Sequence, residues 1–152
     1  MKFHAFNLHQ DIIAAIADNG YTTPTPIQKE AIPPIMTGRD LLGLAQTGTG
    51  KTAAFALPII HQLMTGHRRR LRALVLAPTR ELAAQIQENI AALSRRTGLR
   101  SMAIYGGVNM TPQIQSLRRG VEIVVACPGR LLDHLSQKTI DLSTIEILVI
   151  DE

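Results

Sequence analysis

The strongest constraint on the fold is an alternation of short, β-rich apolar runs with segments of helical periodicity. Runs of this length and composition are typical of buried strands. They cover residues 41–45, 73–77, 101–105, 121–126 and 146–150. Because strands that alternate with helices pair in parallel through right-handed crossovers, the pattern predicts an α/β fold with a mostly parallel sheet flanked by helices.

The helical segments carry start and stop signals. Gly20 is a candidate left-handed cap after residues 11–18, and Thr79 is a candidate N-cap for a helix that reaches about Leu93. Other helices are expected over residues 52–63, with Pro58 as a kink, over 111–120, opened by Thr111 and Pro112 and closed by Gly120, and over 129–135.

Length and composition set broad limits. With 152 residues, 45% of them apolar, the chain has room for one domain with a buried core. Cys127 is the only cysteine and cannot form an internal disulfide, which favours a reducing compartment, with the cytoplasm as the default. No stretch reaches the roughly 18 apolar residues of a membrane span. The net charge of +4 suits a polyanionic partner, and the few aromatic residues favour contacts with a nucleic-acid backbone over base stacking.

Ligands of parallel α/β sheets lie beyond the carboxyl ends of the strands. Residues 45–52, directly after the first apolar run, fit the phosphate-loop pattern A-x-x-x-x-G-K-T, with Ala45 in place of the usual first Gly. Gly48 and Gly50 would let backbone N–H groups surround phosphate oxygens. Lys51 would reach the β and γ phosphates, and Thr52 would hold Mg²⁺. A glycine-rich turn without a ligand would not require Lys-Thr, so the sequence predicts a nucleotide site.

Asp151 and Glu152 end the last apolar run. An acid at a strand end is the usual second element of a phosphate site, where Asp151 would hold Mg²⁺ and Glu152 would orient and deprotonate the attacking water. The alternative is an ordinary loop turn.

Gln28 has two interpretations. With Thr25 as N-cap it forms a plausible capping box, and its amide could also read the edge of an adenine. The residues alone leave both open.

The basic residues divide by position. Arg68–Arg70, Arg72, Arg118 and Arg119 precede apolar runs, and we expect them in solvated loops. Arg80 and Arg130 follow such runs, where a guanidinium group suits phosphate contacts.

In this order and spacing the motifs resemble those of the DEAD-box helicases, and within them the bacterial RhlE-type group. Residues 20–28 (GYTTPTPIQ) are similar to the Q motif, with Phe3 as its upstream aromatic residue. Residues 45–52 (AQTGTGKT) resemble motif I, 78–83 (PTRELA) motif Ia, Gly106-Gly107 the GG element, and 149–152 the opening of the DEAD motif. The resemblance covers essentially the whole chain.

The resemblance implies a RecA-like P-loop fold, incomplete at its C-terminus, that binds ATP with Mg²⁺ and the backbone of RNA. It implies catalytic roles for Lys51 and Glu152 and metal binding by Thr52 and Asp151. It implies nucleotide contacts from Phe3, Tyr21, Gln28, Thr47, Gly48, Thr49, Gly50, Lys51 and Thr52, and RNA contacts from Pro78, Thr79, Arg80, Gly107, Pro128, Gly129 and Arg130. Cys127 departs from the family's usual Thr, and a thiol is the weaker hydrogen-bond donor.

The expected organisation is a Q-motif region, residues 1–34, that forms one structural unit with a partial RecA-like ATP-binding domain, residues 35–152. The family's second RecA-like domain and its Ser-Ala-Thr strand are absent, so we expect a gap in the sheet and no RNA unwinding by this chain alone. The function implied is the ATP- and RNA-binding part of an ATP-dependent RNA helicase. Two alternatives are a truncated module that binds ATP or RNA without turnover, and another P-loop enzyme such as a small-molecule kinase.

Overall fold

Four of the apolar runs form one parallel sheet in the computed structural model, which describes all of residues 1–152. Its strands are β1 (Ala73–Leu76), β2 (Ser101–Ile104), β3 (Ile123–Ala126) and β4 (Ile147–Ile150), in the spatial order β2-β3-β1-β4. Every neighbouring pair is parallel. The predicted α/β class and parallel pairing are therefore confirmed.

Residues 41–45 form no strand, so this part of the prediction is wrong. Leu42 is 90% exposed and Leu44 89% exposed. An apolar run becomes a strand only where a neighbouring strand takes up its backbone N–H and C=O groups. No strand of the sheet pairs with residues 41–45, and β4 pairs with β1 alone. Composition gives no information about the presence of such a neighbour.

The helices follow the sequence prediction closely. They are the 3₁₀ helix η1 (Phe3–Phe6) and the α-helices α1 (Gln10–Asp18), α2 (Pro26–Met36), α3 (Lys51–Leu63), α4 (Arg80–Leu93), α5 (Met110–Arg119) and α6 (Pro128–Ser136). The predicted cap of α4 is confirmed, because Thr79 Oγ1 accepts a hydrogen bond from Leu82 N at 3.2 Å. The predicted cap of α5 is wrong: Asn109 Oδ1 accepts from Thr111 N at 2.9 Å, so the helix starts before Thr111. No helix has the length and apolarity needed to cross a membrane.

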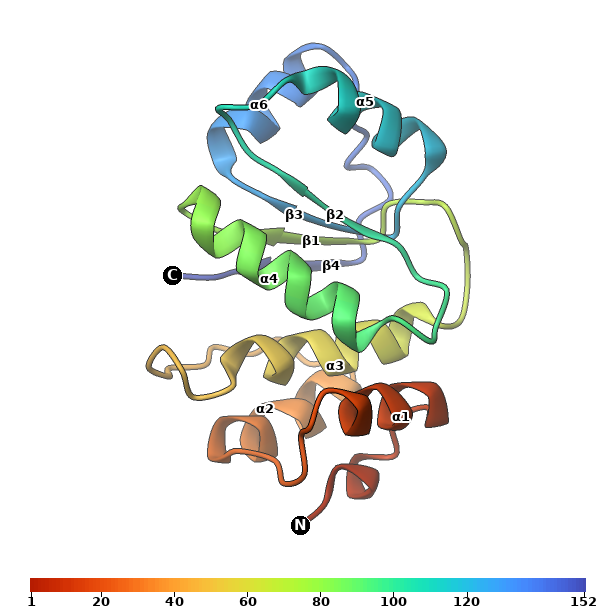
Figure 1. Cartoon of the computed structure of the whole chain (residues 1–152), viewed down its shortest axis with the longest axis vertical. Coiled ribbons are helices and arrows are strands. Elements are labelled where there is room, and N and C mark those ends of the chain that lie inside the picture. Colours follow the sequence, from red (N-terminus) through yellow and green to blue (C-terminus); the bar gives the residue numbers. More distant parts are fainter. The chain divides into compact units, whose positions relative to one another are not determined.

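The chain forms two compact units. The first consists of residues 1–65 and 92–98, and the second of residues 66–91 and 99–152. In the first unit α2 packs on α3, as Figure 1 shows. Fully buried side chains of three helices form its interior: Ile12, Ile32, Leu57, Ile60 and Leu63. This packing fixes the start of α3, where the predicted phosphate loop ends.

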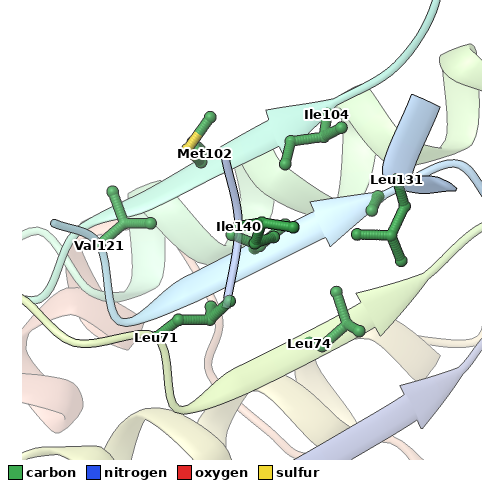
Figure 2. Packing of buried hydrophobic residues seen from close by; sticks show 9 residues of the cluster. Leu71, Leu74, Met102, Ile104, Val121, Leu131 and Ile140 are labelled. Atoms are coloured by element: carbon green, nitrogen blue, oxygen red, sulfur yellow. The ribbon is translucent and has the colours of Figure 1, made fainter. Parts of the chain in front are cut away.

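One apolar cluster of the second unit lies on one face of the sheet. The parallel register aligns Met102, Val124 and Leu74 across three strands, and Ile104 and Ala126 lie in the next row. Figure 2 shows these side chains packed with Leu71, Val121, Leu131 and Ile140. In Figure 1, α5 and α6 cover this face. This packing holds the sheet in place, and with it the points at which the loops after its strands begin.

The opposite, amino-terminal ends of the strands contain a buried arginine. Arg72 is 5% exposed, donates to the carboxylate of Glu146 through Nε, and donates to His67 O at 3.1 Å through Nη1. The prediction of a solvated Arg72 is therefore wrong, because a buried guanidinium is tolerated when a carboxylate pairs with it. Arg68–Arg70, Arg118 and Arg119 are exposed as predicted.

Candidate functional site

The predicted phosphate loop has the backbone that its glycines favour. Gly48 has φ +85° and Gly50 has φ +86°, a left-handed conformation that glycine adopts without penalty. Gly50 is the N-cap residue of α3, so the loop leads directly into the amino terminus of that helix. Residues 46–48 are exposed, and Thr49 Oγ1 donates to Gln46 O at 2.6 Å. Exposed N–H groups at a helix amino terminus form a site for phosphate oxygens.

Gln28 connects this loop to the start of α2. Its Oε1 accepts from Thr25 N at 3.0 Å, and its Nε2 donates to Gly50 O at 3.1 Å. The Gln28 half of the predicted capping box is therefore formed, and the same side chain, only 4% exposed, also contacts the phosphate loop. A Cβ atom on Gly50 would lie 2.5 Å from Gln28 Nε2, so this close approach requires glycine. An amide can form two hydrogen bonds through each of its two ends, which leaves room for a further partner.

The two predicted aromatic contacts of the nucleotide differ in exposure. Phe3 is 5% exposed, and its ring centroid lies 6.2 Å from that of Phe6 in an edge-on arrangement. Tyr21 is 39% exposed and follows Gly20, which has the predicted left-handed φ of +79°. Of the two rings, Tyr21 has the larger surface available for a ligand.

The oxygen ligands predicted for Mg²⁺ lie at element ends. Lys51 and Thr52 form the start of α3, in the first unit. Asp151 and Glu152 directly follow β4, in the second unit. Asp151 is 6% exposed, and its backbone N donates to Leu76 O at 3.0 Å, which continues the ladder between β1 and β4. A hydroxyl and a carboxylate are ligands that suit Mg²⁺, which binds through a few protein oxygens together with phosphate.

The carboxyl ends of β1, β2 and β3 form a second polar surface. We call it the strand-end face and define it as residues 78–80, 105–108 and 128–130. The guanidinium carbon of Arg80 lies 4.9 Å from the ring centroid of Tyr105, a cation–π arrangement. A Cβ atom on Gly107, whose φ is +80°, would lie 3.1 Å from Arg80 Nη1. The structure thus brings Arg80 and Gly107 together.

Arg130 contacts the same face from α6. Its Nη1 donates to Val108 O at 3.0 Å, and its Nε lies 3.6 Å from Asp133 Oδ2. Its side chain is only 12% exposed. Pro128 and Gly129, by contrast, are exposed at the start of α6. Arg130 therefore joins α6 to the loop that contains Gly107.

Cys127 is the N-cap residue of α6 but its side chain makes no capping hydrogen bond. Its backbone N donates to Ile104 O at 2.8 Å, which aligns the start of α6 with β2. Burial, and to a smaller extent the charge of Glu81, raise the pKa of the Cys127 thiol. The thiol therefore stays neutral, and a neutral thiol is a weaker hydrogen-bond donor than the hydroxyl of Thr.

Sequence reasoning missed three residues that link the segments of the strand-end face to one another: Tyr105, Gln113 and His134. Gln113 is 7% exposed and His134 fully buried. A signal was present, since Gln113 has helical spacing to Leu117 and His134 has it to Leu131. Each polar residue therefore stands in the apolar stripe of its helix. A polar residue in such a stripe indicates a buried hydrogen bond, but not which partner it has.

A parallel α/β sheet and a glycine loop that leads into a helix with Lys-Thr in its first turn define the class of P-loop nucleotide-binding proteins. The family model described as DEAD/DEAH box helicase matches residues 25–152. The chain therefore belongs to the DEAD/DEAH box helicase family, and the family predicted from its motifs is confirmed.

Curated relatives match along the whole chain. The chain is 48% identical to the ATP-dependent RNA helicase DeaD of Buchnera aphidicola, over 100% of this chain and 25% of that protein. It is 46% identical to the ATP-dependent RNA helicase CshA of Listeria monocytogenes, over 99% of this chain and 29% of that protein. It is 42% identical to the DEAD-box ATP-dependent RNA helicase RhpA of Helicobacter pylori, over 99% and 30%. The chain thus spans less than a third of the length of these relatives, and its assignment to the RhlE-type group stays a prediction.

Proposed function

We propose that this chain is the ATP- and RNA-binding part of an ATP-dependent RNA helicase. The observation that carries the proposal is the hydrogen bond from Gln28 Nε2 to Gly50 O, at 3.1 Å. It joins the Q motif and the phosphate loop inside one compact unit. A general P-loop enzyme would need no such connection, whereas a site that senses adenine and phosphate together would use it. The names of the relatives support the same function.

On the nucleotide side, the amide of Gln28 and the ring of Tyr21 would contact adenine, with Phe3 supporting this end of the site. The backbone of Thr47–Gly50 and the ammonium group of Lys51 would bind the phosphates. Lys51 would also stabilise charge on the γ phosphate during transfer.

On the catalytic side, Thr52 and Asp151 would hold Mg²⁺, which when bound neutralises charge on the phosphates. Both side chains offer oxygen, so their chemistry fits this ion. Glu152 would orient the attacking water and take its proton.

The strand-end face would bind the RNA backbone. Pro78, Thr79 and Arg80 follow β1 and are all exposed, and Gly107, Pro128 and Gly129 offer exposed backbone nearby. Guanidinium and backbone N–H groups suit phosphate oxygens and carry no base information, so binding would be independent of sequence. A partner RecA-like domain, a reducing location such as the cytoplasm, and unwinding of duplexes belong to this proposal for the longer protein.

The test measures ATP hydrolysis by the chain with and without single-stranded RNA, beside Gln28→Ala. RNA-stimulated hydrolysis that favours ATP over GTP, with this preference lost in Gln28→Ala, supports the proposal. Binding of ATP and RNA without turnover would favour the inert module. Equal use of GTP and ATP by the unaltered chain would instead favour a different P-loop enzyme and overturn the role of Gln28.

A further inference from the structure

A buried polar network lies directly beneath the strand-end face. Gln113 of α5 is at its centre: Nε2 donates to Tyr105 O at 3.0 Å, and Oε1 lies 2.9 Å from His134 Nε2 and 3.4 Å from Arg130 Nη1. All of these residues belong to the second unit. One side chain therefore contacts the end of β2 and two residues of α6.

The hydrogen bonds fix the orientation of each group. Because Gln113 Nε2 donates to a carbonyl, Oε1 is the end that faces His134 and Arg130, and it must accept from both. His134 therefore carries a proton on Nε2, and its Nδ1 lies 2.7 Å from Thr139 Oγ1, a hydroxyl that can also donate to His134 O at 3.1 Å. Burial, and then the charge of Arg130, lower the pKa of His134, whereas Asp133 raises it. A neutral ring can donate from Nε2 to Gln113 and accept at Nδ1 from Thr139.

The network determines the position of the Arg130 guanidinium group. Its Nη1 is shared between Gln113 Oε1 and Val108 O, and its Nε faces Asp133. A guanidinium has five N–H donors in a rigid plane, so fixing Nη1 and Nε also fixes the direction of Nη2. The same contacts hold the backbone of Tyr105 and Val108 on either side of Gly106 and Gly107.

We propose that Gln113 and His134 are positioning residues for RNA binding: they hold Arg130 and the loop 105–108 in one fixed arrangement at the strand-end face. The proposal rests on the proposed function, because RNA is the ligand for which this face is arranged. Neither residue touches the ligand, and both act through Arg130 and the loop. A long side chain that is already ordered loses less conformational entropy when a phosphate binds.

The first measurement needs no RNA. In the ¹⁵N-labelled chain, relaxation of the Arg130 Nε–H group should report a rigid side chain, and Gln113→Leu, which keeps the apolar volume, should make it mobile. Gln115→Leu is the matched control, because Gln115 lies on the same helix but is exposed. His134→Gln keeps an N–H donor toward Gln113 and should preserve the order of Arg130, whereas His134→Leu should abolish it. Unchanged order in Gln113→Leu would overturn the proposal.

The second measurement is affinity for a short fluorescein-labelled oligouridylate. Gln113→Leu should weaken binding roughly threefold to tenfold, the effect of one lost hydrogen bond. In the Arg130→Ala background the same substitution should cause a smaller further loss, because the part of its effect that passes through Arg130 is already gone. Losses that multiply in the double variant would overturn the positioning role and indicate a general loss of structure.

The two measurements separate the inference from the function on which it rests. If the unaltered chain does not bind the oligouridylate, or if Arg130→Ala and Arg80→Ala leave affinity unchanged, the proposed RNA face is wrong. In that case the relaxation measurement still decides whether Gln113 and His134 hold Arg130 in place.

Discussion

Replacing Gly50 with Ala should damage the phosphate loop through two separable effects. The residue has φ +86°, and forcing a residue with a side chain into this left-handed conformation costs about 1–2 kcal/mol. The new Cβ would also lie 2.5 Å from Gln28 Nε2, so the amide must withdraw and lose its hydrogen bond to Gly50 O. That loss adds about 0.5–1.5 kcal/mol. Together the two effects predict a loss of about 1.5–3.5 kcal/mol in the free energy of unfolding.

Gly48→Ala is the matched control. Gly48 has φ +85°, but a Cβ placed there meets no atom within 4 Å. It should therefore lose only the backbone part, about 1–2 kcal/mol. Combining Gly50→Ala with Gln28→Ala removes the crowded amide, so the double variant should lose less than the sum of its single substitutions.

Urea unfolding followed by circular dichroism measures these differences, provided that the slope with urea concentration stays the same among the variants. ATP affinity measured on the same samples should fall further for Gly50→Ala than for Gly48→Ala. Equal losses of stability for the two glycines, or full additivity with Gln28→Ala, would refute the reasoning that Gln28 and the loop depend on each other.

Two further predictions concern the second unit. Glu122 is 1% exposed and accepts hydrogen bonds from the backbone N–H groups of Arg69 and Arg100. Glu122→Ala should therefore lose about 2–4 kcal/mol of stability in urea unfolding. Glu88→Ala, at an exposed position, should be near neutral, and equal effects of the two substitutions would contradict this prediction. His134 has a pKa lowered chiefly by burial and then by Arg130, so its protonation favours the unfolded chain. Stability should be unaffected by this group well above pH 6.5, the ordinary histidine value, and should fall as the pH drops below it. His134→Gln should lose part of this slope in a pH series of urea titrations, and an unchanged slope would show that His134 is not the group responsible.

Periodicity predicted most of the fold because periodicity reports burial. The strands from Ala73 to Ile150 and all the α-helices that were assigned appear within a few residues of their predicted bounds. Residues 41–45 have the same apolar character and failed, since a strand also needs a ladder partner, and that partner lies outside the run itself. Pairing is a property of two segments, whereas composition describes one.

The candidate site was predictable to a similar extent and for a related reason. The loop at Gly48 and Gly50 needs left-handed glycines and a helix start, both of which are local and visible in the sequence. Gln28 makes the predicted capping contact with Thr25 and also contacts Gly50 of the phosphate loop, whereas its contact with adenine stays a prediction. Arg72 was misjudged and His134 was missed because a buried polar group depends on distant partners, and those become known only when the elements pack.

The measurement that tests the central claim most directly is titration of the chain with ATP in the presence and absence of Mg²⁺, beside Lys51→Ala, with the thermal melt followed in parallel. The account predicts saturable binding that Mg²⁺ strengthens, an increase in melting temperature on binding, and loss of both effects in Lys51→Ala with its own melt unchanged. Equal binding by the Lys51→Ala variant, or no binding by a chain that melts cooperatively, would contradict the claim that the loop after residue 45 is a nucleotide site.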